Sequence, residues 1–217
     1  MLHRLLLLVF CITLPTIAHA DIRATYSDGS VIEISDEGAI RSNVVSDGKW
    51  LIHKDGANYM LVPDQGTVKV LDADVVKQVT EALTPEFITM MVQQMPPLAP
   101  HPAGEVKIAG RSATGYVIDD EREVSFAVSS DPELARLGAG ISHQFIVWTY
   151  MQGPLGELSA PLAQMLDSGA AVRIGKVDLV SVEVVELAAD TFALPGEPLD
   201  WHQTEAVMKR TGLIEVG

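Results

Sequence analysis

The strongest constraint on the fold is a run of short apolar segments between Asp28 and Leu71, separated by glycine-containing turns. The turn glycines are 9, 10, 8 and 10 residues apart. Glycine accepts the positive φ that tight hairpins require, so this spacing predicts consecutive antiparallel strands. The predicted turns are Asp28-Gly29, Asp36-Glu37-Gly38, Asp47-Gly48, Asp55-Gly56 and Asp64-Gln65-Gly66.

The later segments of this run, residues 58–62 and 67–71, are nearly apolar on both faces, which predicts that both faces are covered. A helix beginning at Asp72 or Asp74 is the expected cover, because its valines and leucine recur at helical spacing. A second helix is predicted from Thr84-Pro85-Glu86, with proline in its first turn.

The second half of the chain predicts more strands, at residues 105–109, 113–118 and 123–128, after a loop over 96–104. Ser130 and Glu133 have capping-box spacing and predict a helix to about Met151, in which Gly138 and Gly140 weaken the helix or admit a close neighbour. A short helix over residues 159–167 and two strands over 170–174 and 177–187 follow, and then a terminal helix over 201–210. In the second of these strands, Val180, Val182 and Val184 are expected to face one side. The predicted class is α+β, with a curved, mostly antiparallel sheet.

The first twenty residues have the pattern of a cleavable signal peptide. Arg4 precedes an apolar segment over 5–14, and Ala18-His19-Ala20 fits the cleavage pattern. We therefore expect a single mature domain over 21–217, in the periplasm or secreted; an uncleaved anchor is the alternative. Cys11 is the only cysteine, and Phe10 before it disfavours lipidation, so no disulfide or thiolate chemistry is expected.

The charge argues against nucleic acid as a partner. The formal net charge is −14 and the acidic residues are spread along the chain. Such a field repels phosphate backbones and anionic headgroups. The apolar segment over 5–14 is also too short to span a membrane, and cleavage would leave no transmembrane span.

Motifs for catalysis, metals or cofactors are missing from the sequence. The histidines of the predicted mature chain, His53, His101, His143 and His202, show no helical zinc-site spacing, and no nucleophile elbow or P-loop occurs. The Asp-Gly turns lack the alternating acids of a calcium loop. We therefore expect no cofactor, no metal and no enzymatic activity. The alternative is a hydrolase whose residues meet only in the fold, with His143, a carboxylate and a serine in one cleft.

A surplus of large apolar side chains gives the one candidate site. Methionine adapts to irregular partners and is common where an apolar ligand must fit. An apolar ligand pocket is predicted from Trp50, Tyr59, Met60, Phe87, Met91, Phe145 and Trp148. The competing interpretation is that these residues fill an ordinary core.

The order of segments resembles a periplasmic half-barrel superfamily that includes the outer-membrane lipoprotein carrier and several uncharacterised families. The resemblance lies in residues 30–71, in Ala113-Thr114-Gly115-Tyr116 and in Phe192-Ala193-Leu194-Pro195-Gly196. It implies an incomplete barrel with helices on its concave side, where carriers shelter acyl chains.

These observations together predict an exported, non-enzymatic envelope protein that binds an apolar ligand or the acyl chain of a lipidated partner in a concave site. The second interpretation is a periplasmic protein–protein interaction module with a filled core. Its expected mark is a large exposed apolar patch.

Overall fold

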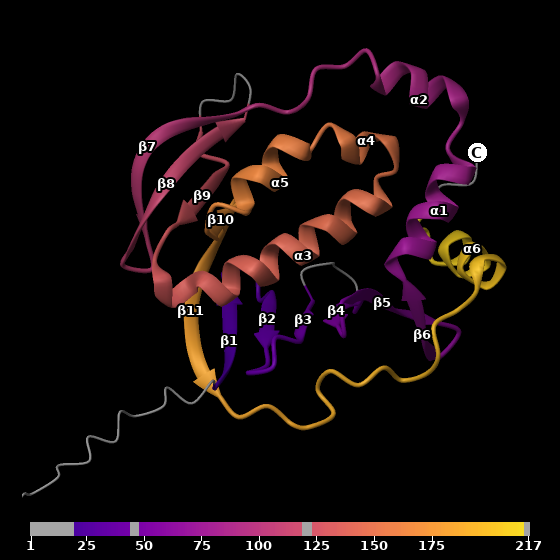
Figure 1. Ribbon diagram of the computed structural model, residues 1–217, viewed down its shortest axis with the longest axis horizontal. Helices are drawn as coiled ribbons and strands as arrows, with labels where there is room; N and C mark the ends of the chain where they lie inside the picture. The colour runs from indigo at the N-terminus through magenta and orange to yellow at the C-terminus, as the bar shows by residue number, and fades with distance from the viewer. Residues whose placement is uncertain (1–19, 44–47, 119–122, 215–217) are drawn as a thin grey trace, which may run out of the picture.

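The computed structural model describes residues 20–43, 48–118 and 123–214 (Figure 1). Residues 1–19 of the predicted signal peptide and Asp47 lie outside them, as do residues 119–122 between two predicted strands. The described chain is α+β, as predicted: eleven strands form one antiparallel sheet, accompanied by six α-helices. The sheet is not closed, because β6 and β7 end the strand order β6-β5-β4-β3-β2-β1-β11-β10-β9-β8-β7.

The N-terminal half is the predicted series of hairpins. Its strands are β1 (Asp21–Tyr26), β2 (Val31–Ile34), β3 (Ile40–Ser42), β4 (Trp50–Lys54), β5 (Ala57–Asp64) and β6 (Thr67–Asp72). The five turn glycines all have positive φ, between 72° and 92°, as hairpin turns require. Asp72 then caps α1 (Ala73–Leu83) by accepting hydrogen bonds from two backbone N–H groups of the first turn, and α2 (Glu86–Val92) follows.

The C-terminal half builds a second group of strands around a long helix. Strands β7 (Pro100–Ile108), β8 (Arg111–Ile118) and β9 (Phe126–Ser129) precede a 3₁₀ turn, η1 (Pro132–Leu134), and α3 (Ala135–Met151). The short helices α4 (Pro154–Glu157) and α5 (Ala160–Leu166) lead to β10 (Ala170–Ile174) and β11 (Val177–Val185). Residues 186–199 then run to α6 (Trp201–Arg210), which Asp200 opens with a capping box.

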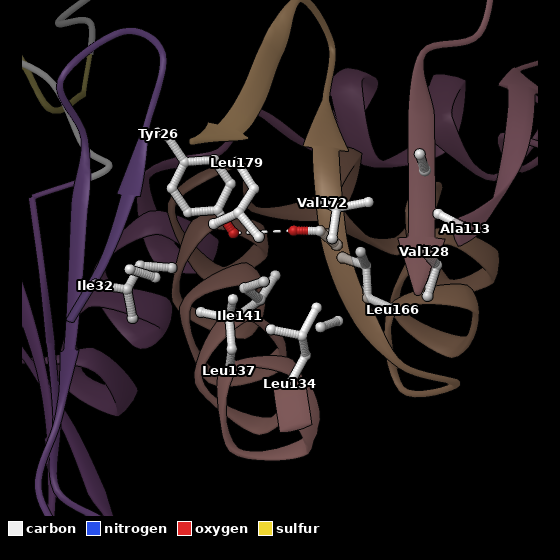
Figure 2. Close-up of a cluster of buried hydrophobic side chains, with 14 of the residues drawn as sticks. Tyr26, Ile32, Ala113, Val128, Leu134, Leu137, Ile141, Leu166, Val172 and Leu179 are labelled. Carbon is white, nitrogen blue, oxygen red and sulfur yellow. Dashed lines mark hydrogen bonds between the residues drawn. The ribbon is translucent and has the colours of Figure 1, made fainter. Parts of the chain in front are cut away.

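Strand β11 joins the two halves into one sheet. Its beginning pairs with β10, where Arg173 lies opposite Asp178, and the rest pairs with β1, from Tyr26–Leu179 to Asp21–Val185. The buried hydroxyl of Tyr26 donates a hydrogen bond to the carbonyl of Ala171 in β10, 2.9 Å away, past the intervening strand (Figure 2). Burial raises the pKa of this hydroxyl far above its usual range, so it remains a donor.

Helix α3 covers the junction. It packs against β2 and β10 and lies across the row of strands (Figure 1). Leu134, Leu137 and Ile141 recur at helical spacing and pack with Ile32, Leu179 and other strand residues in the main core (Figure 2). The main core is therefore built from both halves of the chain.

A second core lies between β4–β6 and the helices. Leu51, Met60, Val62 and Leu71 pack with residues of α1, α3 and α6. The opposite face of these strands carries a smaller cluster, Ile52, Leu61 and Val70, against which Leu194 of the C-terminal segment packs. Both faces are thus covered, as the apolar segments predicted.

Several local predictions were wrong, among them the start of β9, which is Phe126 rather than residue 123. Strand β1 was missed, and β7 begins at Pro100 rather than Glu105. Asp131, not Ser130, accepts the first-turn hydrogen bond before α3. On β11, Thr25 pairs with Ser181 and Tyr26 with Leu179, so Val180 is the extra residue of a β-bulge and breaks the expected alternation.

The two glycines of α3 admit close neighbours. A Cβ added at Gly138 would lie 2.9 Å from the carbonyl oxygen of Gly169, which is backbone. At Gly140 the nearest atom is the terminal methyl Cδ1 of Ile34, at 3.1 Å. The end of a side chain can move more easily than backbone, so Gly140 should tolerate an added Cβ better than Gly138.

We predict that G138A lowers the free energy of unfolding by about 1–3 kcal/mol, because the helix must move away from the α5–β10 connection. G140A should change it by less than about 1 kcal/mol, because the higher helix propensity of alanine offsets a small shift of Ile34. Urea unfolding followed by circular dichroism measures both. Equal losses in the two variants would contradict this account of α3 packing.

Candidate functional site

Helix α2 has its large apolar side chains on the face turned away from the protein. Val92 is buried at 3% exposure, and Ile88 and Thr89, four and three residues earlier, are half-buried, so this face anchors the helix. Phe87, Met90 and Met91 lie on the opposite face and are 63%, 52% and 48% exposed. Met95, just after the helix, is similarly exposed.

Segments next to α2 also carry exposed apolar side chains. α2 contacts α4, where Leu155 is exposed, and Leu83 is exposed at the end of α1. We call Leu83, Phe87, Met90, Met91, Met95 and Leu155 the α2 apolar surface. Gathered apolar side chains of this kind mark interaction or ligand sites, whereas scattered ones need no explanation.

The segment that carries this surface is held at both ends. The N–H of Thr84 donates to carbonyls of the last turn of α1, and Pro85 separates the two helices. Beyond α2, the N–H of Leu98 donates to the carbonyl of Leu158, 2.8 Å away in the α4–α5 connection. The apolar side chains are therefore presented on an ordered platform.

Phe145 and Trp148 continue the core-facing stripe of α3 beyond the packed core. They follow Ile141 at steps of four and three residues, and their rings stack with centroids 5.4 Å apart. Phe145 packs against the main core, but Trp148 is 40% exposed. The last turns of α3 thus offer an accessible aromatic side chain on the face that elsewhere packs against strands.

The remaining predicted pocket residues lie on two opposite faces of the sheet. Trp50 and Tyr59 pack against the small cluster near Leu194, and the guanidinium of Arg41 lies 3.9 Å from the centroid of the Trp50 ring. Met60 points to the other face and is fully buried in the second core. The seven residues therefore occupy three regions: Phe87 and Met91 on α2, Phe145 and Trp148 on α3, and Trp50, Tyr59 and Met60 within the packed sheet.

A cleft of about 620 Å³ lies between α3 and the α5–β10 connection. It brings His143 together with Asp167, Ser142 and Ser168, the residue types of the hydrolase alternative. The Ser168 hydroxyl donates to the carbonyl of Met165, and the His143 ring stacks on His53 instead of meeting a hydroxyl. Among the described residues, no hydrogen bond links this histidine to a serine, as nucleophilic catalysis requires.

Within residues 20–43, 48–118 and 123–214, no three histidine, cysteine or acidic side chains gather where they would hold a metal ion. In the same part of the chain, no helix combines the length and apolar character needed to cross a membrane. Comparison with protein-family models, curated proteins and solved structures finds no match to this chain.

The sequence prediction included Phe87 and Met91 but omitted Leu83, Met90, Met95 and Leu155 from the site. The spacing of Ile88 and Val92, four residues apart, was the available signal for the anchored face of α2. Once that face is assigned, Phe87, Met90 and Met91 follow as the outward face.

We predict that the double variant F87S/M91S changes the free energy of unfolding by less than about 0.5 kcal/mol, because both side chains are already exposed. The neighbouring V92A should cost about 1–3 kcal/mol, because it leaves a gap beneath the helix. Urea unfolding of the two variants measures the contrast. A large loss in F87S/M91S would mean that the α2 apolar surface is packed against the rest of the chain.

Proposed function

We propose that this chain is an exported, non-enzymatic envelope protein that binds an acyl chain, from a lipid or a lipidated partner, on the α2 apolar surface. The observation that carries the proposal is the outward face of α2, where Phe87, Met90 and Met91 are each about half exposed or more. Export to the periplasm or the exterior is part of the proposal and rests on the signal-peptide pattern of residues 1–20.

The chemistry of the surface supports an acyl chain as the occupant. An acyl chain has no hydrogen-bonding groups, and the six side chains of the surface offer none. Methionine and phenylalanine supply flexible, polarizable contacts that adapt to a mobile chain. A peptide segment, in contrast, brings backbone polar groups that need partners.

Charge around the surface indicates what the acyl chain is attached to. Glu81, Glu86 and Glu157 are exposed on the three helices that carry the surface, and the net charge is −14. These carboxylates disfavour free fatty acids and anionic headgroups. An acyl chain on a neutral headgroup or on a protein is therefore the better occupant.

The sheet geometry is consistent with the half-barrel resemblance. The strand order leaves the sheet open, and α3 contacts both β2 and β10, which lie on opposite sides of the β1–β11 junction. We propose that the sheet curves around α3 as an incomplete barrel. The interior is filled by the two cores, so the acyl chain lies on the α2 apolar surface.

The expected affinity is modest. Burying roughly six methylenes gains about 5 kcal/mol, at about 0.8 kcal/mol for each. That free energy corresponds to a dissociation constant of roughly 0.2 mM. Weak, reversible binding suits a protein that delivers its ligand onward.

Photo-crosslinking tests the proposal, with phosphatidylcholine carrying a diazirine on one acyl chain as the probe, in neutral vesicles at pH 7.5. We predict labelling concentrated in peptides that contain residues 83–95 and Leu155, and at least a fivefold lower yield there in F87S/M91S. The matched control is V180S/V184S, because Val180 and Val184 are equally exposed apolar residues on β11. Labelling that follows exposure alone, with Val184 marked as strongly as Phe87, would refute the proposal.

The filled cores favour a second candidate, a protein–protein interaction module that uses the same face. Met60, Val62 and Leu71 have no exposed surface, so the described sheet offers no hollow interior on that side. This candidate gains support if the acyl probe does not label α2 while a protein partner, captured from the periplasm, is lost in F87S/M91S and retained in V180S/V184S.

A further inference from the structure

A stacked pair of histidines joins α3 to the sheet. The rings of His143 on α3 and His53 on β4 lie with centroids 3.8 Å apart and planes inclined by 17°. His53 is held in place by a hydrogen bond between its Nδ1 and Oδ1 of Asn58 on β5, at 3.0 Å. An unperturbed imidazole gains its charge between pH 5 and 8, so a contact between two imidazole rings is sensitive to acidification.

The packing beside the pair is incomplete. A void of about 10 Å³ is lined by His53, His143 and Gln144 together with apolar residues of β3, β4 and α3, Val147 among them. Among the described residues, the buried Nε2 of Gln144 has no hydrogen-bond partner. Toward the start of the helix, Gly140 packs closely against Ile34. The turn of α3 that carries His143 is therefore incompletely packed against β4.

We propose that His53 and His143 form a pH-sensitive latch, which holds the middle of α3 on β4 when neutral and releases it when both rings are protonated. Release exposes apolar side chains of the second core, including Leu51 and Val147. The consequence for ligand binding rests on the proposed function, because the exposed side chains would enlarge the surface available to an acyl chain.

The electrostatics give the direction of the switch. Burial, and then the neighbouring His53, lower the pKa of His143 below its ordinary value, while the carboxylate of Asp167 at the end of α5 acts in the opposite direction. Asn58 and Gln144, which also face the pair, carry no charge. Because the closed form disfavours protonation of His143, the population of the open form rises as the pH falls below about 6.5.

Hydrogen exchange with mass spectrometry on the whole chain tests the latch, at pH 7.5 and pH 5.0, after correction for the pH dependence of intrinsic exchange. We expect protection of peptides within residues 139–151 to fall at least tenfold at pH 5.0. H143F retains a ring that stacks but does not titrate, so its protection should not change between the two pH values. H101Q, which removes an exposed histidine on β7, should behave as the unaltered protein does.

H53F removes the second ring and should give a smaller fall than the unaltered protein, because the burial that lowers the pKa of His143 remains. It keeps the proposal testable if H143F does not fold. Equal protection at the two pH values in the unaltered protein, or the same fall in H143F or H53F, would overturn the latch. The acyl probe separates the two proposals: labelling of α2 at pH 7.5 tests the proposed function alone. If the acyl probe does not label α2 at pH 7.5 while hydrogen exchange still responds to pH, the proposed function is refuted and the latch is retained.

Discussion

The structure depends on the pairing of β11 with strands from both halves of the chain. Pairing with β1 and β10 converts two separate groups of hairpins into one sheet, and the β1–β11 contacts join residues far apart in the sequence, whereas β10 and β11 form a local hairpin. The Tyr26–Ala171 hydrogen bond spans the same junction. α3 packs over it, so the main core exists only after the C-terminal strand is in place. Contacts of such long sequence separation are formed late and at an entropic cost.

This arrangement determines which apolar residues remain available for function. The strands and α1, α3 and α6 bury most of their large side chains in the two cores. α2 lies outside that arrangement and contacts α4, with Phe87, Met90 and Met91 turned outward. Leaving large apolar groups in water costs free energy, so their presence together on one helix indicates that a ligand or partner covers this surface. The function that we propose therefore lies on an exposed surface beside a filled core.

Local chemistry explains what could be predicted from the sequence. The Asp-Gly turns specified the hairpins, and Asp72 specified the start of α1, because both depend on backbone geometry a few residues long. The bulge at Val180 and the early start of β7 depend on partner strands distant in sequence, which no local pattern reveals. Phe87 and Met91 were named as site residues, but only packing shows that they face outward while Met60 is enclosed.

Native mass spectrometry with organic extraction tests the central claim most directly, on protein purified without detergent. Because the expected dissociation constant is about 0.2 mM, the account predicts that incubation with neutral lipid vesicles at about 1 mM lipid adds mass to the unaltered chain. This mass should extract as an acyl lipid and be greatly reduced in F87S/M91S. A mass equal to that of the bare chain, unchanged after incubation with neutral lipid vesicles, would contradict it and leave the α2 apolar surface without the occupant proposed here.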